Sequence, residues 1–157
     1  MDARTYYLSR LRPSASRHGS SLEKEEQIRN IMTEWVLFRQ YWQESDSATA
    51  LAEKVDVSGE ELASFISDCF GERFTVIRKR LRIDDACHIM LRYPDMPVSQ
   101  AGRTVGIFDK SDFRKIFVKE KGCTPSVWKK CGGRKDRILV SLLLDKARNR
   151  FQSPRKS

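Results

Sequence analysis

Apolar residues recur at steps of three and four residues along most of the chain, which is the period of an amphipathic helix. The first such segment runs from Leu22 to about Trp42. Its apolar positions are Ile28, Ile31, Trp35, Phe38 and Trp42. A longer segment covers residues 74–92 and ends where Tyr93-Pro94 begins a turn, because proline cannot continue a helix. This pattern predicts an all-α fold.

Between these two segments the chain carries a helix-turn-helix pattern. Ala52 is the small residue that allows two helices to cross. Asp56 takes the turn position, where aspartate tolerates the left-handed backbone conformation. Ser58, with Glu61 three residues later, forms a capping box for the second helix. The apolar positions around the turn are Val55, Val57, Leu62 and Phe65.

The same pattern returns about fifty residues later. Gly102 and Gly106 take the crossing and turn positions, and Asp109 can cap the second helix of the pair. Gly122 ends that helix, and Thr124-Pro125 begins a short final one. The apolar positions are Val105, Ile107, Phe113, Ile116 and Phe117. Two lobes built on one plan are therefore expected.

Charge is unevenly distributed along the chain. The 157 residues carry a formal net charge of +9, and 39% of them are hydrophobic, which is enough for a modest core. Residues 22–72 hold 4 Lys and Arg against 12 Asp and Glu, a net charge of −8. Residues 73–133 hold 14 against 6, a net charge of +8, and residues 134–157 add +6. A polyanion is therefore expected to bind the second half.

The two ends of the chain lie outside the tandem pattern. The composition of residues 1–21 predicts a flexible basic arm. The Gly-Gly pair at 132–133 predicts a hinge, and residues 136–151 predict a further amphipathic helix. Its apolar stripe is Leu139, Leu142, Leu143, Ala147 and Phe151. We expect this stripe to pack on the first helix near Trp35 and Trp42, because an acidic lobe attracts a basic tail. Pairing with another chain is the alternative.

The scattered cysteines and histidines favour neither a metal site nor a disulfide framework. The cysteines are Cys69, Cys87, Cys123 and Cys131, without a CxxC pair, and neither histidine has the spacing of a zinc ligand. Without a Ser/His/Asp set or a phosphate loop, we expect neither a cofactor nor enzymatic activity. The N-terminus lacks the apolar core of a signal peptide, and no apolar run is long enough to span a bilayer. These features predict a soluble cytoplasmic protein.

Taken together, these motifs resemble the DNA-binding domain of the AraC/XylS family of bacterial transcription regulators over about residues 24–131. Three stretches carry the resemblance: Leu51-Ala52 to Leu62, Leu81-Arg82-Ile83 with Ala86, and Val98-Ser99 to Thr124-Pro125-Ser126. The resemblance implies two homeodomain-like helix-turn-helix lobes, each of three helices, joined by a long helix. The expected division is a flexible arm (1–21), a first lobe (22–73), a connecting helix (74–92), a second lobe (93–131) and a basic amphipathic tail (132–157).

The resemblance also implies which side chains contact double-stranded DNA. Carried over, the recognition helices are about 59–70 and 109–120. The second helix offers Lys110, Ser111, Asp112, Arg114 and Lys115, and the connecting helix offers Arg78, Arg80 and Arg82 to phosphates. The first helix departs from the family, since its outward residues are Glu60, Ala63, Ser64 and Ser67, and the family often has Arg where Ser64 stands. We expect the second lobe to dominate affinity.

Two alternatives remain open from the sequence. Phe108, before the second recognition helix, is either a hydrophobic staple or an exposed wedge. The acidic first lobe contacts DNA, for example through Glu60 to cytosine, or docks a protein such as RNA polymerase. The sequence thus predicts a sequence-specific DNA-binding transcription regulator, with a protein-interaction module as the alternative. No small-molecule effector domain is recognisable in these residues, so we expect control through abundance, a partner or a further domain.

Overall fold

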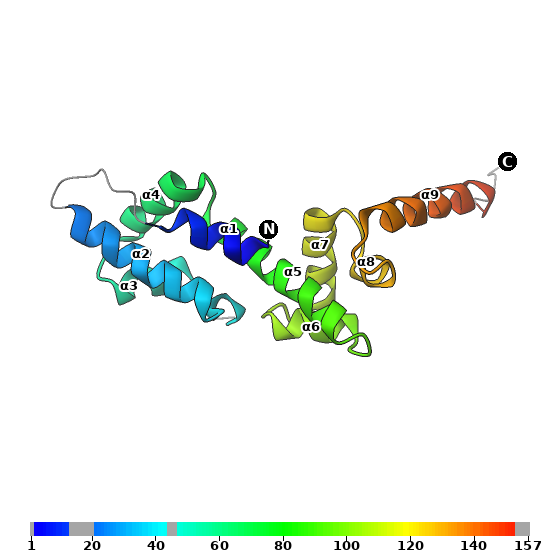
Figure 1. Ribbon diagram of the computed structural model, residues 1–157, viewed down its shortest axis with the longest axis horizontal. Helices are drawn as coiled ribbons and strands as arrows, with labels where there is room; N and C mark the ends of the chain where they lie inside the picture. The colour runs from blue at the N-terminus through cyan, green and yellow to red at the C-terminus, as the bar shows by residue number, and fades with distance from the viewer. Residues whose placement is uncertain (1, 13–20, 44–46, 153–157) are drawn as a thin grey trace. The chain divides into compact units, whose positions relative to one another are not determined.

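The computed structural model describes residues 2–12, 21–43 and 47–152 (Figure 1). The helices are α1 (Ala3–Arg10), α2 (Ser21–Leu37), the 3-10 helix η1 (Gln40–Trp42), α3 (Ala48–Lys54), α4 (Gly59–Phe70), α5 (Phe74–Arg92), α6 (Val98–Thr104), α7 (Lys110–Lys121), α8 (Pro125–Lys130) and α9 (Lys135–Gln152). The described ranges contain helices and turns and no strand. The all-α prediction is confirmed.

The chain divides into two compact units. The first consists of Met1–Asp85 together with Thr104–Gly106, and the second consists of Ala86–Arg103 and Ile107–Ser157. The division falls inside α5. This helix is continuous over residues 74–92, the segment expected to connect the lobes.

The second helix of each helix-turn-helix motif begins and ends at the residues that the sequence indicated. The Ser58 hydroxyl accepts a hydrogen bond from the Glu61 amide at 3.1 Å, and the Asp109 carboxylate accepts one from the Asp112 amide at 2.9 Å. Each cap satisfies an amide that the first helical turn leaves unpaired. Gly71 and Gly122, with φ of +66° and +77°, end α4 and α7 in the left-handed conformation that glycine adopts without strain.

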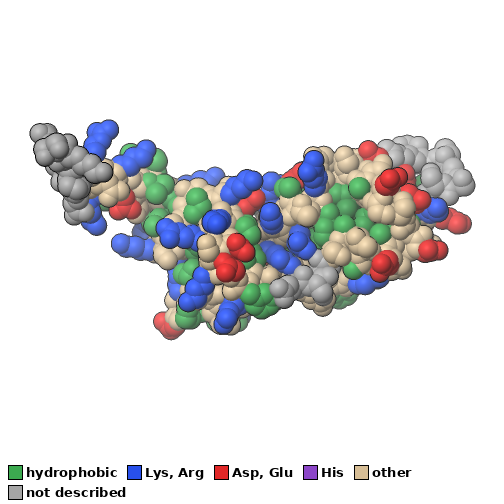
Figure 2. Space-filling view, turned by 180° about the vertical axis from the view of Figure 1, so that it is seen from behind, with side chains coloured by type: hydrophobic (Ala, Val, Ile, Leu, Met, Phe, Trp, Pro, Cys, Tyr) green, Lys and Arg blue, Asp and Glu red, His purple; other side chains and the backbone are tan. Residues whose placement is uncertain are grey.

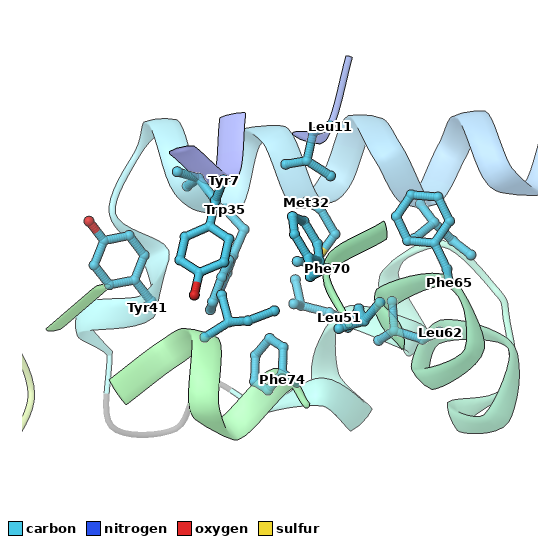
Figure 3. Close-up of a cluster of buried hydrophobic side chains, with 14 of the residues drawn as sticks. Tyr7, Leu11, Met32, Trp35, Tyr41, Leu51, Leu62, Phe65, Phe70 and Phe74 are labelled. Atoms are coloured by element: carbon cyan, nitrogen blue, oxygen red, sulfur yellow. The ribbon is translucent and has the colours of Figure 1, made fainter. Parts of the chain in front are cut away.

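The core of the first unit contains α1, which the sequence had suggested to be part of a flexible arm (Figure 3). Tyr7 is fully buried and Leu11 is 2% exposed, packed with side chains of the later helices. These two residues are one helical turn apart, so a single face of α1 buries both. The expectation of a flexible arm is wrong for residues 3–11, whereas its part at 13–20 lies outside the described residues.

Polar contacts hold α1 against α5. The Tyr7 hydroxyl donates to Glu72 Oε1 at 3.3 Å, and Arg80 Nη1 donates to Glu72 Oε2 at 2.6 Å and to the Tyr7 hydroxyl at 3.1 Å. Burial raises the pKa of Tyr7 to about 12, an effect that the nearby Arg80 partly opposes. Helix α1 is thus joined to the unit by apolar packing and by a hydrogen-bonded ion pair.

The end of α2 differs from the sequence prediction. The helix stops at Leu37, Arg39 adopts a left-handed conformation with φ of +52°, and Phe38 is 71% exposed. The apolar stripe expected to run to Trp42 is therefore broken. Trp35 is fully buried, with its ring centroid 5.4 Å from Tyr41 and 4.9 Å from Phe74. Its own unit encloses Trp35, so this residue offers no surface to the tail stripe, and the expected packing of that stripe on the first helix stays a prediction.

A buried acid in α5 binds the segment that follows α2. Asp85, 3% exposed, accepts hydrogen bonds from the Tyr41 hydroxyl and from the Trp42 indole nitrogen, the latter at 2.8 Å. Arg39 Nε lies 3.5 Å from the same carboxylate oxygen, Oδ2. Burial and the bond to Asp85 raise the pKa of Tyr41, so this hydroxyl keeps its proton.

In the second unit, close contact between α6 and α7 requires a glycine. A Cβ atom at Gly102 would lie 2.7 Å from Phe113 Cγ, closer than real side chains approach. Phe113 continues into an edge-to-face series with Phe117 and Trp128, at centroid distances of 5.7 and 6.1 Å. The crossing position assigned to Gly102 is confirmed.

The Gly-Gly pair expected to act as a hinge forms a tight turn between α8 and α9. Gly132 and Gly133 have φ of +61° and +72°. A Cβ atom at Gly133 would lie 2.6 Å from Trp128 Cζ2, so this backbone packs directly on the indole ring. The start of α9 is thereby held against the core of the second unit.

We predict that Tyr7→Ala lowers the free energy of unfolding by about 3–5 kcal/mol, because it removes a fully buried ring and leaves its polar partners unsatisfied. Tyr6→Ala is the matched control, since that neighbouring ring is 38% exposed and should cost much less. Urea denaturation of both variants provides the measurement. Equal losses would contradict the structural role of α1.

For the second unit, we predict that Gly102→Ala destabilises the protein by about 1–3 kcal/mol, since the added methyl group overlaps the Phe113 ring. Gly59→Ala, at a helix start with no neighbouring atom within 4 Å of the new Cβ, should leave stability unchanged or raise it. Thermal melts of the two variants would distinguish these effects. A neutral Gly102→Ala would refute the close helix crossing.

Candidate nucleic-acid interface

Helix α7 presents one buried and one exposed face. Phe113 and Phe117 are 2% and 0% exposed, and they anchor the helix to the second unit. The residues predicted to contact DNA are all exposed: Lys110, Ser111, Asp112, Arg114 and Lys115. Helical periodicity places Ser111, Asp112, Arg114 and Lys115 away from the two phenylalanines, whereas Lys110 lies on their side of the helix, exposed in its first turn. The predicted set is therefore exposed along one rigid helix, with Lys110 at its N-terminal end.

Within this set, Asp112 has a different electrostatic character from its neighbours. Its carboxylate lies in the first turn of α7, where the partial positive charge of the helix end favours an acid. The same carboxylate repels phosphate, so Asp112 suits helix capping or a base amino group better than a backbone contact. Lys121, which the sequence prediction did not include, is exposed and lies seven residues after Arg114, so the helical period places both on one side of α7.

Phe108 lies immediately before the cap of α7. Its side chain is 51% exposed, although aromatic residues of this size usually lie in a core. Of the two alternatives left open by the sequence, the structure favours the exposed ring over a staple buried against the helix. The N-terminal end of α7 thus combines an apolar ring with the cation of Lys110.

The arginines predicted on α5 do not form a common phosphate-binding surface. Arg82 is only 8% exposed and points into the first unit. It donates to the carbonyl oxygens of Tyr41 and Gln43 at 2.5 and 2.9 Å, and lies 3.5 Å from that of Gly106. The predicted phosphate contact of Arg82 is wrong, because backbone carbonyl oxygens of the first unit bind its guanidinium group.

The other two arginines of this cluster are also involved in contacts of the first unit. Arg80 is paired with Glu72 and Tyr7, so an acidic group already balances its charge. Arg78 is half-buried, with its guanidinium carbon 5.9 Å from the centre of the Phe74 ring. Lys79, between them, is exposed. Only part of the predicted phosphate cluster therefore faces solvent.

Helix α4 of the first unit has a different outer surface. Glu60, Ala63, Ser64 and Ser67 are exposed, as the helical period predicted. The helix contains no Lys or Arg residue, and Glu60 and Glu61 occupy its first turn. By itself, α4 therefore offers hydrogen-bonding groups and negative charge, without a cation to bind phosphate.

The fold brings basic side chains to α4 from distant parts of the sequence. Glu60 and Ser64 line a cavity of about 830 Å³ whose wall also contains Arg10, Arg12, Lys24 and Arg29. Arg29 donates to the carbonyl oxygens of Leu11 and Arg12, both at 3.1 Å. Periodicity within α4 does not indicate these cations, because they come from α1, from the segment after it and from α2.

The surface charges of the two units agree with the uneven distribution of charge along the sequence. On the face shown in Figure 2, Lys and Arg side chains predominate on the second unit, and Asp and Glu gather on the first.

Among the described residues, no group of His, Cys, Asp and Glu side chains could hold a metal ion. In the same residues, no helix has the length and apolar character needed to cross a membrane.

Comparison with known proteins places this geometry in a family. A family model described as "Helix-turn-helix domain" matches residues 51–130. The fold is similar to the C-terminal domain of AraT, a response regulator from Geobacillus stearothermophilus, with a TM-score of 0.57, 20% identity, and coverage of 73% of this chain and 88% of that one. It is also similar to the C-terminal domain of the two-component response regulator yesN from Fusobacterium nucleatum, with a TM-score of 0.56, 24% identity, and coverage of 68% and 98%.

No curated protein sequence matches the chain. The family match covers both helix-turn-helix motifs and the helix between them, the same region that carried the resemblance in the sequence. The chain therefore belongs to the AraC-type helix-turn-helix family of DNA-binding transcription regulators.

Proposed function

We propose that this regulator recognises specific duplex DNA sequences mainly through α7 of its second unit. The observation that carries the proposal is the exposed face of α7, where Lys and Arg side chains stand on a helix anchored by buried phenylalanines. A helix of this kind fits the major groove, which is wide enough to admit it and presents a distinct pattern at each base pair.

Individual side chains have different roles in this proposal. Lys110 and Ser111, in the first turn of α7, are placed to contact base edges, and a lysine ammonium suits guanine O6 and N7. Arg114 and Lys115 bind the flanking phosphates, which position the helix without reading sequence. The exposed ring of Phe108 provides an apolar contact suited to a thymine methyl group.

A second candidate function concerns the first unit. The exposed face of α4 is acidic and lacks its own cations, which opposes close approach to phosphates. A basic or polar surface of another protein, such as RNA polymerase, suits this face better than the phosphate backbone of DNA does. Under this proposal the second unit binds DNA and the first unit contacts a partner.

Lys110→Ala should weaken specific DNA binding by about 1–3 kcal/mol, because a base contact is lost. Lys54→Ala, which removes an exposed lysine from α3 of the acidic unit, is the matched control and should have little effect.

The DNA affinity of the wild-type chain should fall on the order of a thousandfold between about 50 and 200 mM salt. Fluorescence anisotropy on a site selected from random DNA measures both effects. A flat salt response would overturn the proposal.

Substitutions at Ser64 test the first unit. If α4 faces the groove, Ser64→Arg adds a phosphate contact and should tighten nonspecific DNA binding severalfold, roughly 1 kcal/mol or more. If α4 docks a protein, affinity for DNA should not change. We expect Ser64→Ala to cost little in either case, because Ser64 is one exposed hydroxyl. A larger loss for Ser64→Ala than for Lys110→Ala would reverse the proposed ranking of the two helices.

A further inference from the structure

Helix α9 carries an apolar strip that its own unit leaves in solvent. Leu139, Val140, Leu143 and Leu144 are 60%, 56%, 57% and 61% exposed. They form two adjacent rows, since each pair four residues apart lies on the same side of the helix. Large aliphatic side chains grouped in this way are unusual on the surface of a monomer and mark an interaction site.

The other side of α9 is the one that faces its unit. Ile138, Ser141 and Leu142 are half-buried, and α9 packs against α8. The turn at Gly133 lies against Trp128, which holds the start of the helix. The exposed strip is therefore a second apolar face on a helix whose first face is already in use.

We propose that the exposed strip of α9 binds the same strip of a second copy of this chain, with the two helices antiparallel. Asp136, Leu143 and Arg150 are spaced by seven residues in α9, about two helical turns, so they share one face. With Leu143 on the two-fold axis, Asp136 of each copy lies across from Arg150 of the other, and Leu139 lies across from Ala147.

Charge complementarity selects both the partner and the direction. In a parallel pair, Asp136 would face Asp136 and Arg150 would face Arg150, and both contacts are repulsive. In the antiparallel pair both contacts join opposite charges. Asp136 lies 3.2 Å from Arg134 within its own chain, but this exposed pair contributes little and can rearrange. A two-fold axis also places the same apolar residues on each side of the interface.

The net charge of α9 sets how strong this dimer is. The helix has 5 Lys and Arg against 2 Asp, so two copies repel each other at long range. One helix from each chain makes an interface at the small end of the range for specific complexes, and the dimer is therefore weak. Salt screens the repulsion and leaves apolar packing intact. Dimerisation should strengthen with salt, opposite to the binding of DNA or of an acidic membrane.

The first test is sedimentation equilibrium of the full chain without DNA, over roughly a hundredfold range of concentration. Leu143→Glu should weaken the dimer by roughly a hundredfold or more, because it places two carboxylates together on the axis. Asn149→Glu makes the same change of charge at an exposed position outside the strip and should leave the dimer nearly intact. Circular dichroism would establish that both variants keep their helices.

A charge exchange tests the direction of the pair. Asp136→Arg and Arg150→Asp should each weaken the dimer by roughly threefold to tenfold, because each creates like-charge contacts at both ends of the interface. The double variant should restore the affinity of the unaltered chain. In a parallel dimer the double variant would bring no rescue.

The outcomes separate this inference from its alternatives. A wild-type chain that stays monomeric at every concentration overturns it, as does a Leu143→Glu variant that dimerises like Asn149→Glu. Binding of the monomer to vesicles of acidic lipid, lost in Leu143→Glu, would assign the strip to a membrane instead. Because no DNA is present, the result does not depend on the proposed function of α7.

Discussion

The architecture of the first unit depends on two buried charges one turn apart in α5, Arg82 and Asp85. Burying a charge is costly unless it is hydrogen-bonded, and both side chains are bonded to the same short segment after α2. Asp85 binds the side chains of Tyr41 and Trp42, and Arg82 binds the backbone of Tyr41 and Gln43. Removing Asp85 would leave the Tyr41 hydroxyl and the Trp42 indole without this acceptor, and removing Arg82 would leave the carbonyls of Tyr41 and Gln43 without this donor.

This constraint extends to a turn that is distant in the sequence. Gly106 has φ of +94°, and a Cβ atom there would lie 2.2 Å from the Trp42 carbonyl oxygen. The turn before α7 therefore needs glycine for its backbone conformation and for its close approach to Trp42. Asp56 occupies the equivalent turn before α4 with φ of +50°, and its side chain is exposed. Two similar motifs thus place different demands on their turn residues.

The same local plan has produced two helices with different surfaces. Helices α4 and α7 are both capped by a side chain, ended by a glycine and anchored by buried phenylalanines. Their buried faces are alike because each must pack on its own lobe. Their exposed faces experience no such constraint, so one carries acids and serines and the other carries lysines and arginine. Helix α9 extends this division, since its exposed strip is apolar and suits association instead of phosphate contact.

The sequence by itself determined the helices of the two helix-turn-helix motifs, their caps, the glycine crossing at Gly102 and the exposed residues of α7, because these depend on residues within a few turns of one another. It also located the charge difference between the halves, which is a sum over residues. Only the tertiary structure decided that Tyr7 joins the core, that Arg82 is buried, and that Arg10 and Arg29 reach the α4 cavity. Those outcomes depend on contacts between distant segments. An arginine or tyrosine on a helical face is outward or inward according to the partner it meets, and periodicity does not specify that partner.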